Sequence, residues 1–231
     1  MSEEKNVSVE ETSSMSFAAK FIGVITSPVA TFAEIVKSPT WFLPLLLAVI
    51  VTMGITYQMV PMIVEMTAEE MQKNPNMTEE AMEQALSYVE IASPLMPLVT
   101  VPIWSVIVAA LMLLIGGLFM GGSSSFKTLF CVANWTAPVM IVTGLIGMGL
   151  RMITGAMESA TSLIFLAPEA ERDSAIYFLL TQIDLMAIWY FAILGIGFAA
   201  AFKFTTQKGL VTTFLSWGVV ILAITAIKAA F

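Results

Sequence analysis

The chain has 231 residues, of which 58% are hydrophobic and 12% are charged, and its formal net charge is −7. Its mean hydropathy of +0.89 is more apolar than a soluble bundle of this length can hide, so the ordinary soluble classes are excluded. Histidine is absent and Cys131 is the single cysteine, which removes the commonest general base, the histidine-activated nucleophiles and any intramolecular disulfide. We therefore expect no catalytic residues, no metal site and no cofactor.

The segment before the first long apolar run divides into two parts. Residues 1–15 are polar and acidic without apolar periodicity, which predicts a disordered tail. Residues 16–40 carry apolar residues three and four positions apart, typical of amphipathic helices, with a helix start at Ser27 and Pro28. Three phenylalanines form the apolar side that we predict at the cytoplasmic membrane interface: Phe17, Phe21 and Phe32. Packing of these helices under the bundle stays open as the alternative, because amphipathicity alone does not separate the two arrangements.

Five apolar runs, each of 18 residues or more, fill most of the remaining chain. About 20 apolar residues at a rise of about 1.5 Å each cross a hydrocarbon core about 30 Å thick, so each run predicts a membrane-spanning helix. The runs cover residues 41–64, 94–120, 128–153, 185–202 and 209–227. Three prolines predict a bend at the outer end of the second span: Pro94, Pro97 and Pro102. Residues 41–231 are thus predicted to form one all-α, polytopic membrane helix bundle.

The connections on the two sides of this bundle differ in length and charge. The linkers after the second and fourth spans read GGSSSFK and KFTTQK, whereas residues 65–90 and 151–184 form long acidic connections on the other side. Thr67 and Glu70 have the spacing of a capping box, and Thr78 precedes a second predicted helix. Six of the 10 lysines and arginines fall on the side of the N-terminus: Lys5, Lys20, Lys37, Lys127, Lys203 and Lys208. Because short cytoplasmic loops retain positive charge, we predict a cytoplasmic N-terminus and two partly helical extracytoplasmic loops.

Small residues at four-residue spacing mark the faces on which we expect helices to pack closely. Gly117 and Gly121 form one such pair at the end of the second span. Gly195 and Gly197 each precede an alanine by four residues in the fourth span. Since these pairs are common in membrane bundles and lack the lysine of a phosphate-binding loop, we interpret all four glycines as helix-packing residues and not as ligands.

Three polar or charged residues stand out in or beside the spans. Arg151 ends the third span and Asp184 starts the fourth, and an ion pair between them would close the outer face of the bundle. Asn134 lies within the third span beside Pro138, which frees a backbone carbonyl one turn earlier. Hydrogen bonding between helices is the simpler interpretation of Asn134, and a polar lining for a substrate path is the alternative.

Three segments resemble the Yip1-domain family: FIGVITSPVATFAEIVKSPTWFLPLLL, GGSSSFKTLFCVANWTAPVMI and IDLMAIWYFAILGIGFAAAFKFTTQKG. The first is similar to the family's amphipathic opening and first span. The second is similar to its glycine-ending second helix, short linker and proline-bearing third helix, and the last to its fourth helix and polar turn. In this order on a five-span chain, the likeness covers most of residues 17–231.

The resemblance implies a multi-pass membrane protein with its N-terminus in the cytoplasm, and, for a prokaryotic member, a place in the inner membrane. Eukaryotic members act in vesicle traffic and bind Rab-type small GTPases and one another. The N-terminal tail of this chain is much shorter than the cytoplasmic arm through which those members work, which argues against binding of a small GTPase.

Two functions are compatible with these patterns. We predict a non-enzymatic integral membrane scaffold or adaptor, whose partners are the lipid bilayer and other membrane proteins or further copies of itself, and not nucleic acid. The alternative is a small transporter or channel with a polar path near Asn134 and Pro138. A hydrated cavity reaching Asn134 would favour transport, whereas a dry core would favour the scaffold. An intramembrane enzyme would need carboxylates or a nucleophile and base deep in the core, which the spans lack.

Overall fold

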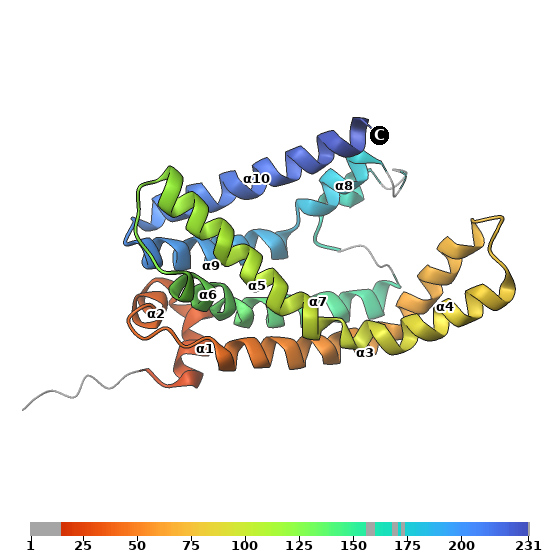
Figure 1. Cartoon of the computed structure of the whole chain (residues 1–231), viewed down its shortest axis with the longest axis horizontal. Helices are drawn as coiled ribbons and strands as arrows, with labels where there is room; N and C mark the ends of the chain where they lie inside the picture. Colours follow the sequence, from red (N-terminus) through yellow and green to blue (C-terminus); the bar gives the residue numbers. More distant parts are fainter. Residues whose placement is uncertain (1–14, 156–159, 168–170, 172–173, 231) are drawn as a thin grey trace, which may run out of the picture.

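The computed structural model describes residues 15–155, 160–167, 171 and 174–230. The predicted disordered tail lies, up to residue 14, outside the described residues, as do parts of the predicted loop at 151–184. The described residues form the helices of Figure 1: α1 (Phe17–Thr26), α2 (Pro28–Ile35), α3 (Phe42–Gln72), α4 (Glu79–Ala92), η1 (Ser93–Leu95), α5 (Pro97–Leu113), η2 (Leu114–Phe119), α6 (Phe126–Trp135), α7 (Ala137–Thr154), η3 (Leu163–Leu166), α8 (Ala175–Gln182), α9 (Leu185–Phe202) and α10 (Thr206–Ala230).

Five of these elements, or pairs of elements, are long and apolar enough to cross a membrane, and each overlaps one of the five predicted runs. They cover Phe42–Gln72, Pro97–Phe119, Phe126–Thr154, Leu185–Phe202 and Thr206–Ala230. The chain is therefore an all-α, polytopic helix bundle. The second of these spans combines α5 and η2, and the third combines α6 and α7.

The two short N-terminal helices form where the sequence predicts them. Ser27 occupies the N-cap position of α2, and Pro28 lies in its first turn. Proline lacks an N–H, but a backbone N–H at this position has no partner within the helix, so no hydrogen bond is lost. The two helices approach closely, because a Cβ atom on Gly23 of α1 would collide with the hydroxyl of Thr31 of α2. They therefore form a tight hairpin that leads into α3.

The first span continues well past its predicted end. α3 runs to Gln72, and Thr67 donates its hydroxyl to the carbonyl of Ile63 at 2.7 Å inside this helix, so the predicted capping box at Thr67 is wrong. The second cap is confirmed, since the Thr78 hydroxyl accepts a hydrogen bond from the backbone N–H of Ala81 at 3.2 Å at the start of α4. Figure 1 shows the end of α3 and the antiparallel α4 projecting beyond the rest of the bundle.

The second span is irregular at both ends. The 3₁₀ turn η1 precedes it, Pro97 is its first residue, and Pro102 lies inside α5. At its other end the helix widens into the π-helical η2, whose hydrogen bonds link residues five apart. Gly121 follows with φ of +65°, a left-handed conformation that favours glycine and reverses the chain toward α6.

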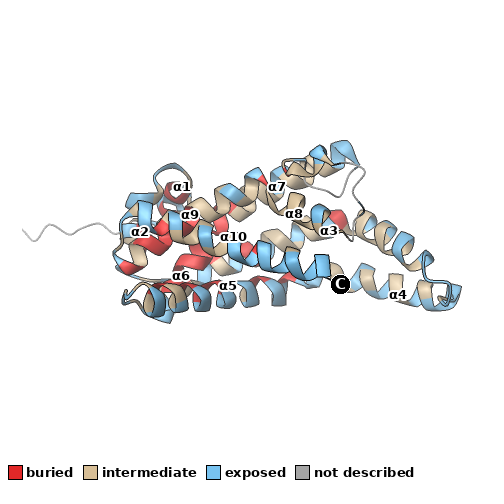
Figure 2. Ribbon diagram, turned by 90° about the horizontal axis from the view of Figure 1, so that it is seen from above, coloured by how far each residue is buried: buried red, intermediate tan, exposed pale blue. Residues whose placement is uncertain are grey.

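The buried core lies at the end of the bundle that holds α1, α2, α6 and α9 (Figure 2). By contrast, α10 packs mainly against α9 and α8 and buries only Gly209 and Ile221 among its described residues. A helix that is apolar all round and yet so exposed is suited to lipid as its solvent.

Candidate functional site

The third span is broken at its most buried point. α6 ends at Trp135 and α7 starts at Ala137, with Pro138 in the first turn of α7. Thr136 lies between the two helices, is completely buried, and donates its hydroxyl to the backbone carbonyl three residues earlier at 2.6 Å. Every residue from 131 to 139 is buried. Such a break within a span is tolerated because side chains and neighbouring helices satisfy the freed backbone groups.

Asn134 connects α6 to α5 just before this break. Its side-chain Nδ2 donates to the carbonyl of Phe130 at 2.7 Å, and its Oδ1 accepts from the hydroxyl of Ser105 at 3.1 Å. Both Asn134 and Ser105 are buried, and neither lines either of the two cavities described below. This geometry favours interhelical hydrogen bonding, which contributes about 0.6 kcal/mol on average in membrane bundles.

One backbone carbonyl holds the linker between α2 and α3 against α6. The carbonyl of Thr40 accepts a hydrogen bond from Trp135 Nε1 at 2.8 Å and lies 3.4 Å from Cys131 Sγ. The next residue, Trp41, packs edge-on against Phe130, with ring centroids 5.3 Å apart. A buried indole N–H needs such an acceptor, so this contact fixes where the first span begins relative to the third.

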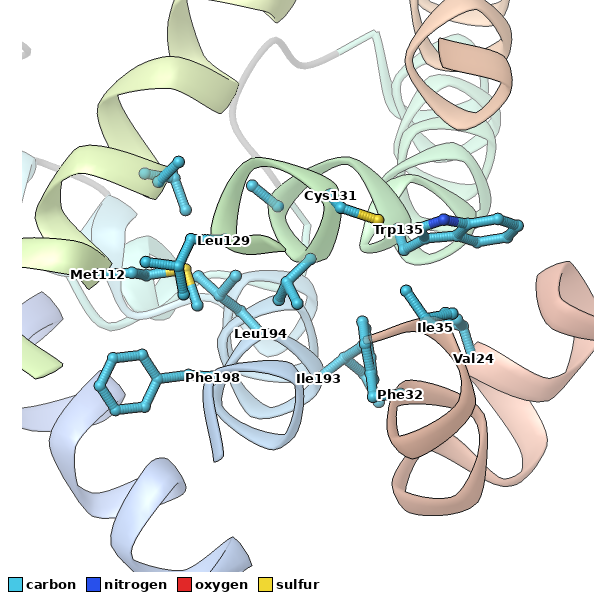
Figure 3. Close-up of a cluster of buried hydrophobic side chains, with 14 of the residues drawn as sticks. Val24, Phe32, Ile35, Met112, Leu129, Cys131, Trp135, Ile193, Leu194 and Phe198 are labelled. Carbon is cyan, nitrogen blue, oxygen red and sulfur yellow. The ribbon is translucent and has the colours of Figure 1, made fainter. Parts of the chain in front are cut away.

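Phe32 lies in the core and not at the membrane interface. Its side chain is 0% exposed, and Figure 3 shows it beside Ile193 in the cluster of buried side chains beneath α6. A Cβ atom on Gly197 of α9 would lie 3.0 Å from Phe32 Cε1 and 2.5 Å from Val132 Cγ1. The structure thus corrects the expected interfacial position of Phe32: α2 packs under the bundle, which was the alternative.

The other two phenylalanines lie nearer the surface, on α1. Phe17 is 36% exposed, and its ring centroid is 5.3 Å from that of Trp135. Phe21 is partly buried against the core. At the exposed end of α2, Lys37 donates to Glu34 at 2.8 Å, and this hydrogen bond lowers the pKa of the Glu34 carboxyl. Contact of α1 with lipid stays a prediction.

Two of the four predicted packing glycines have close neighbours within the chain. A Cβ atom on Gly195 would lie 3.1 Å from Leu210 Cα of α10, and Gly197 is enclosed as described above. Gly117 meets nothing closer than the carbonyl of Gly122 at 4.0 Å, and Gly121 meets nothing within 4 Å. Among the described residues, a side chain at Gly117 or Gly121 would therefore start without a close neighbour.

The glycines next to them make the close contacts instead. A Cβ atom on Gly116 would collide with the ring of Phe202, and one on Gly122 would lie 2.6 Å from both Phe202 and Phe204. Opposite Gly195, Gly209 of α10 is equally enclosed by the backbone of α9. These three glycines seat the η2 turn and α10 against α9.

Asp184 fixes the start of α9. Its Oδ1 accepts hydrogen bonds from the backbone N–H groups of Met186 and Ala187 at 2.7 and 3.2 Å, and its Oδ2 accepts from the hydroxyl of Thr161 at 2.9 Å. A carboxylate here satisfies free N–H groups and interacts favourably with the helix dipole. Arg151 lies in the last turn of α7, and closure of the outer face by a pair with Asp184 stays a prediction.

We expect Asp184→Ala to lower the free energy of unfolding by about 1–2 kcal/mol and Asp184→Asn to lower it much less, because asparagine caps a helix about as well as aspartate. Thermal unfolding in detergent measures the difference, and hydrogen exchange at the amides of Met186 and Ala187 should accelerate only in the alanine variant. Equal stability of the two variants, with unchanged exchange, would show that the cap is unimportant.

Comparison with known families identifies the family of this chain, which the geometry alone does not show. The model of the Yip1 domain matches residues 22–227, a segment that includes all five spans, the break between α6 and α7, and Asp184. The chain belongs to the Yip1 domain family. The likeness of its sequence segments to this family is thereby confirmed. No curated protein and no solved structure matches this Yip1-domain protein.

The matched region of the Yip1-domain protein starts at residue 22, inside α1, and so includes α2 as well as the spans. The boundary that we predict at residue 40 stays a prediction. Three residues that hold this end of the domain together carry no distinctive sequence pattern: Thr40, Ser105 and Gly209. Only an indirect sign of Thr40 and Ser105 was present in the sequence, because Trp135 and Asn134 both require hydrogen-bond partners when buried.

Proposed function

We propose that this Yip1-domain protein is a membrane scaffold or adaptor that acts without catalysis, through lipid contact and association with other membrane proteins. Membership in a membrane protein family and five apolar spans support the coarser statement that it is a multi-pass integral membrane protein. We also infer that the N-terminus is cytoplasmic, because the short lysine-bearing linkers lie at the same end of the bundle as α1 and α2 (Figure 1).

The observation that carries the adaptor proposal is the outward position of Gly117 in η2. A glycine inside a helix costs about 1 kcal/mol relative to alanine, so its presence calls for a reason. Contact with Phe202 explains Gly116, but no close contact in the described part of the chain explains Gly117. Its neighbours Leu118 and Phe119 are 72% and 74% exposed. Small residues on such a face let the backbone of another membrane helix approach closely, and π-helical segments often occur at functional sites.

The transport alternative has weaker support. The hydrogen bonds of Asn134 are made within the protein, and the residues around the helix break are packed into the apolar core. A substrate path at this depth would instead need polar groups that face a water-filled cavity.

Association through Gly117 predicts a dependence on side-chain size at that position. We expect the wild type, purified from its native membranes in mild detergent, to carry a defined second membrane protein. Gly117→Leu should lose this partner, whereas Gly117→Ala should retain it, because alanine still allows close helix approach. A Cβ atom at 117 meets nothing closer than 4.0 Å, so the fold should tolerate both substitutions. Mass photometry together with mass spectrometry of the partners would reveal both results.

A lone protein in all three preparations would contradict the adaptor proposal. A partner that survives Gly117→Leu would place the interface elsewhere on the bundle and contradict the role of Gly117. Gly121 is not suitable for this test, because its φ of +65° strains any other residue whether or not a partner binds there.

A further inference from the structure

A long apolar groove runs along α10, with α9 as its floor; its other wall is α5 over one half, and α7 and α8 together with Trp104 of α5 over the other half. Two cavities of about 530 and 540 Å³ form it, each within the range of about 300–1,000 Å³ that is common for small-molecule sites. They share Trp104, Phe191, Trp217 and Val220, and so adjoin each other along the same helix. On α10 the lining extends from Thr212 to Ile224, which corresponds to about 18 Å at about 1.5 Å per residue.

The lining of this α5–α10 groove suits a lipid chain better than a protein helix. Aromatic, aliphatic and methionine side chains make up most of it, and a few threonines, Ala187, Ser216 and Gln182 complete it. Helices that pack together in membranes use small residues along their contact, whereas Trp104, Phe191 and Trp217 occupy the centre of this groove and would keep the backbone of a partner helix at a distance. The length of the groove is close to the depth of one leaflet, which is about half of the 30 Å hydrocarbon core. One extended acyl chain fits both its shape and its chemistry.

A lysine lies at one end of the groove, on the same face of α10. Lys208, Thr212 and Ser216 follow one another at four-residue spacing, and the last two line the groove. The ammonium of Lys208 lies 3.9 Å from the ring centroid of Phe204, which holds it at the start of the helix. The hydroxyl of Thr212 contacts Met120 Sδ at 3.4 Å, so the end of the second span and α10 meet here, as Figure 1 also shows.

The surroundings of Lys208 are basic. The two linkers at this end of the bundle, residues 120–127 and 203–209, contain Lys127, Lys203 and Lys208 and no carboxylate. At the other end of the bundle, residues 65–90 hold seven carboxylates and one lysine. A negatively charged headgroup is therefore attracted to the end at which the groove begins and repelled from the other.

We propose that the α5–α10 groove binds one acyl chain of an anionic phospholipid, with the phosphate headgroup at Lys208. This inference deepens the lipid-contact part of the proposed function by naming a lipid class and a site. Its readout is bound lipid and not a bound protein, so its failure is distinguishable from failure of the association at Gly117.

The test compares two matched charge removals on the same helix, Lys208→Gln and Lys228→Gln. Each purified protein is placed in nanodiscs that contain phosphatidylglycerol and phosphatidylcholine with identical acyl chains, and the lipid retained after extraction in mild detergent is counted by native mass spectrometry. We expect the wild type and Lys228→Gln to retain phosphatidylglycerol preferentially. Lys208→Gln should reduce that preference about fivefold, the effect of one lysine near an anionic lipid surface.

A second variant, Ser216→Trp, fills the groove and should release the bound lipid of either class, while Leu222→Trp on the exposed side of the same helix should not. An unchanged preference for phosphatidylglycerol in Lys208→Gln would overturn the proposal. So would loss of a bound protein, and not of lipid, in Ser216→Trp, because a partner helix would then occupy the groove. If Ser216→Trp fails to fold, the comparison of the two lysine variants still tests whether the groove selects anionic lipid.

Discussion

Gly197→Leu is expected to lower the free energy of unfolding by at least about 3 kcal/mol, at the upper end of the usual cost of overpacking a core. The first added carbon would already lie 2.5 Å from Val132 Cγ1 and 3.0 Å from Phe32 Cε1. Both neighbours are completely buried and have no room to move. The substitution should therefore push α9 away from α6 and α2 at once and disrupt the core that these three helices share.

Gly218→Leu provides the matched control on α10. A Cβ atom there meets nothing within 4 Å, so the same substitution should change stability by no more than about 0.5 kcal/mol. Thermal unfolding in detergent, followed by the loss of the monodisperse peak in size-exclusion chromatography, compares the two variants. Equal stability of Gly197→Leu and Gly218→Leu would mean that α9 does not approach α6 and α2 as closely as described.

Phe32→Ala is expected to lower the free energy of unfolding by about 3–5 kcal/mol, because it leaves a cavity in a fully buried part of the core. Phe17→Ala should cost no more than about 1.5 kcal/mol, since Phe17 is 36% exposed and loses chiefly its aromatic contact with Trp135. The same thermal unfolding measurement distinguishes the two variants.

This pair of variants also separates the two arrangements of the N-terminal helices. If Phe32 contacted lipid and not the core, Phe32→Ala and Phe17→Ala would have similar, small effects on stability. They would then chiefly weaken binding of the N-terminal segment to liposomes. That result would contradict the packing of α2 beneath the bundle.

The five spans were predictable from sequence because a hydrocarbon core demands about 20 consecutive apolar residues, whatever the helix packs against. The cap at Thr78 and the helix start at Pro28 were predictable because they depend on neighbouring residues only. The end of α3 was not, since a helix that leaves the membrane can continue into water without any apolar signal. Thr67 accordingly bonds back within the helix.

The two predicted packing glycines at the end of the second span have no close neighbour among the described residues, and the geometry of η2 gives the reason. A four-residue spacing aligns two residues on one face of an α-helix, but η2 is a π-helix, in which the residues rotate by a smaller angle. Gly121 already lies beyond the helix, in a left-handed turn. In the regular α9, by contrast, both Gly195 and Gly197 have the close neighbours that the spacing predicts.

The position of Phe32 was not predictable from the amphipathic pattern. Periodicity shows that a helix has an apolar face, but it does not show whether that face meets lipid or protein. The decision rests on tertiary contacts with Gly197 and Val132, which are distant in sequence. The same applies to Asp184, for which the ends of the two spans suggested a pair with Arg151, whereas the cap of α9 appears only in the structure.

The most direct test of the adaptor function is photocrosslinking in native membranes from position 117. A benzophenone amino acid placed at Gly117 faces outward from η2, and the same probe at Gly218 samples the exposed side of α10. We expect the probe at 117 to give one defined adduct with another membrane protein, and the probe at 218 to give chiefly lipid adducts. Lipid adducts alone from both positions would contradict association through the η2 face.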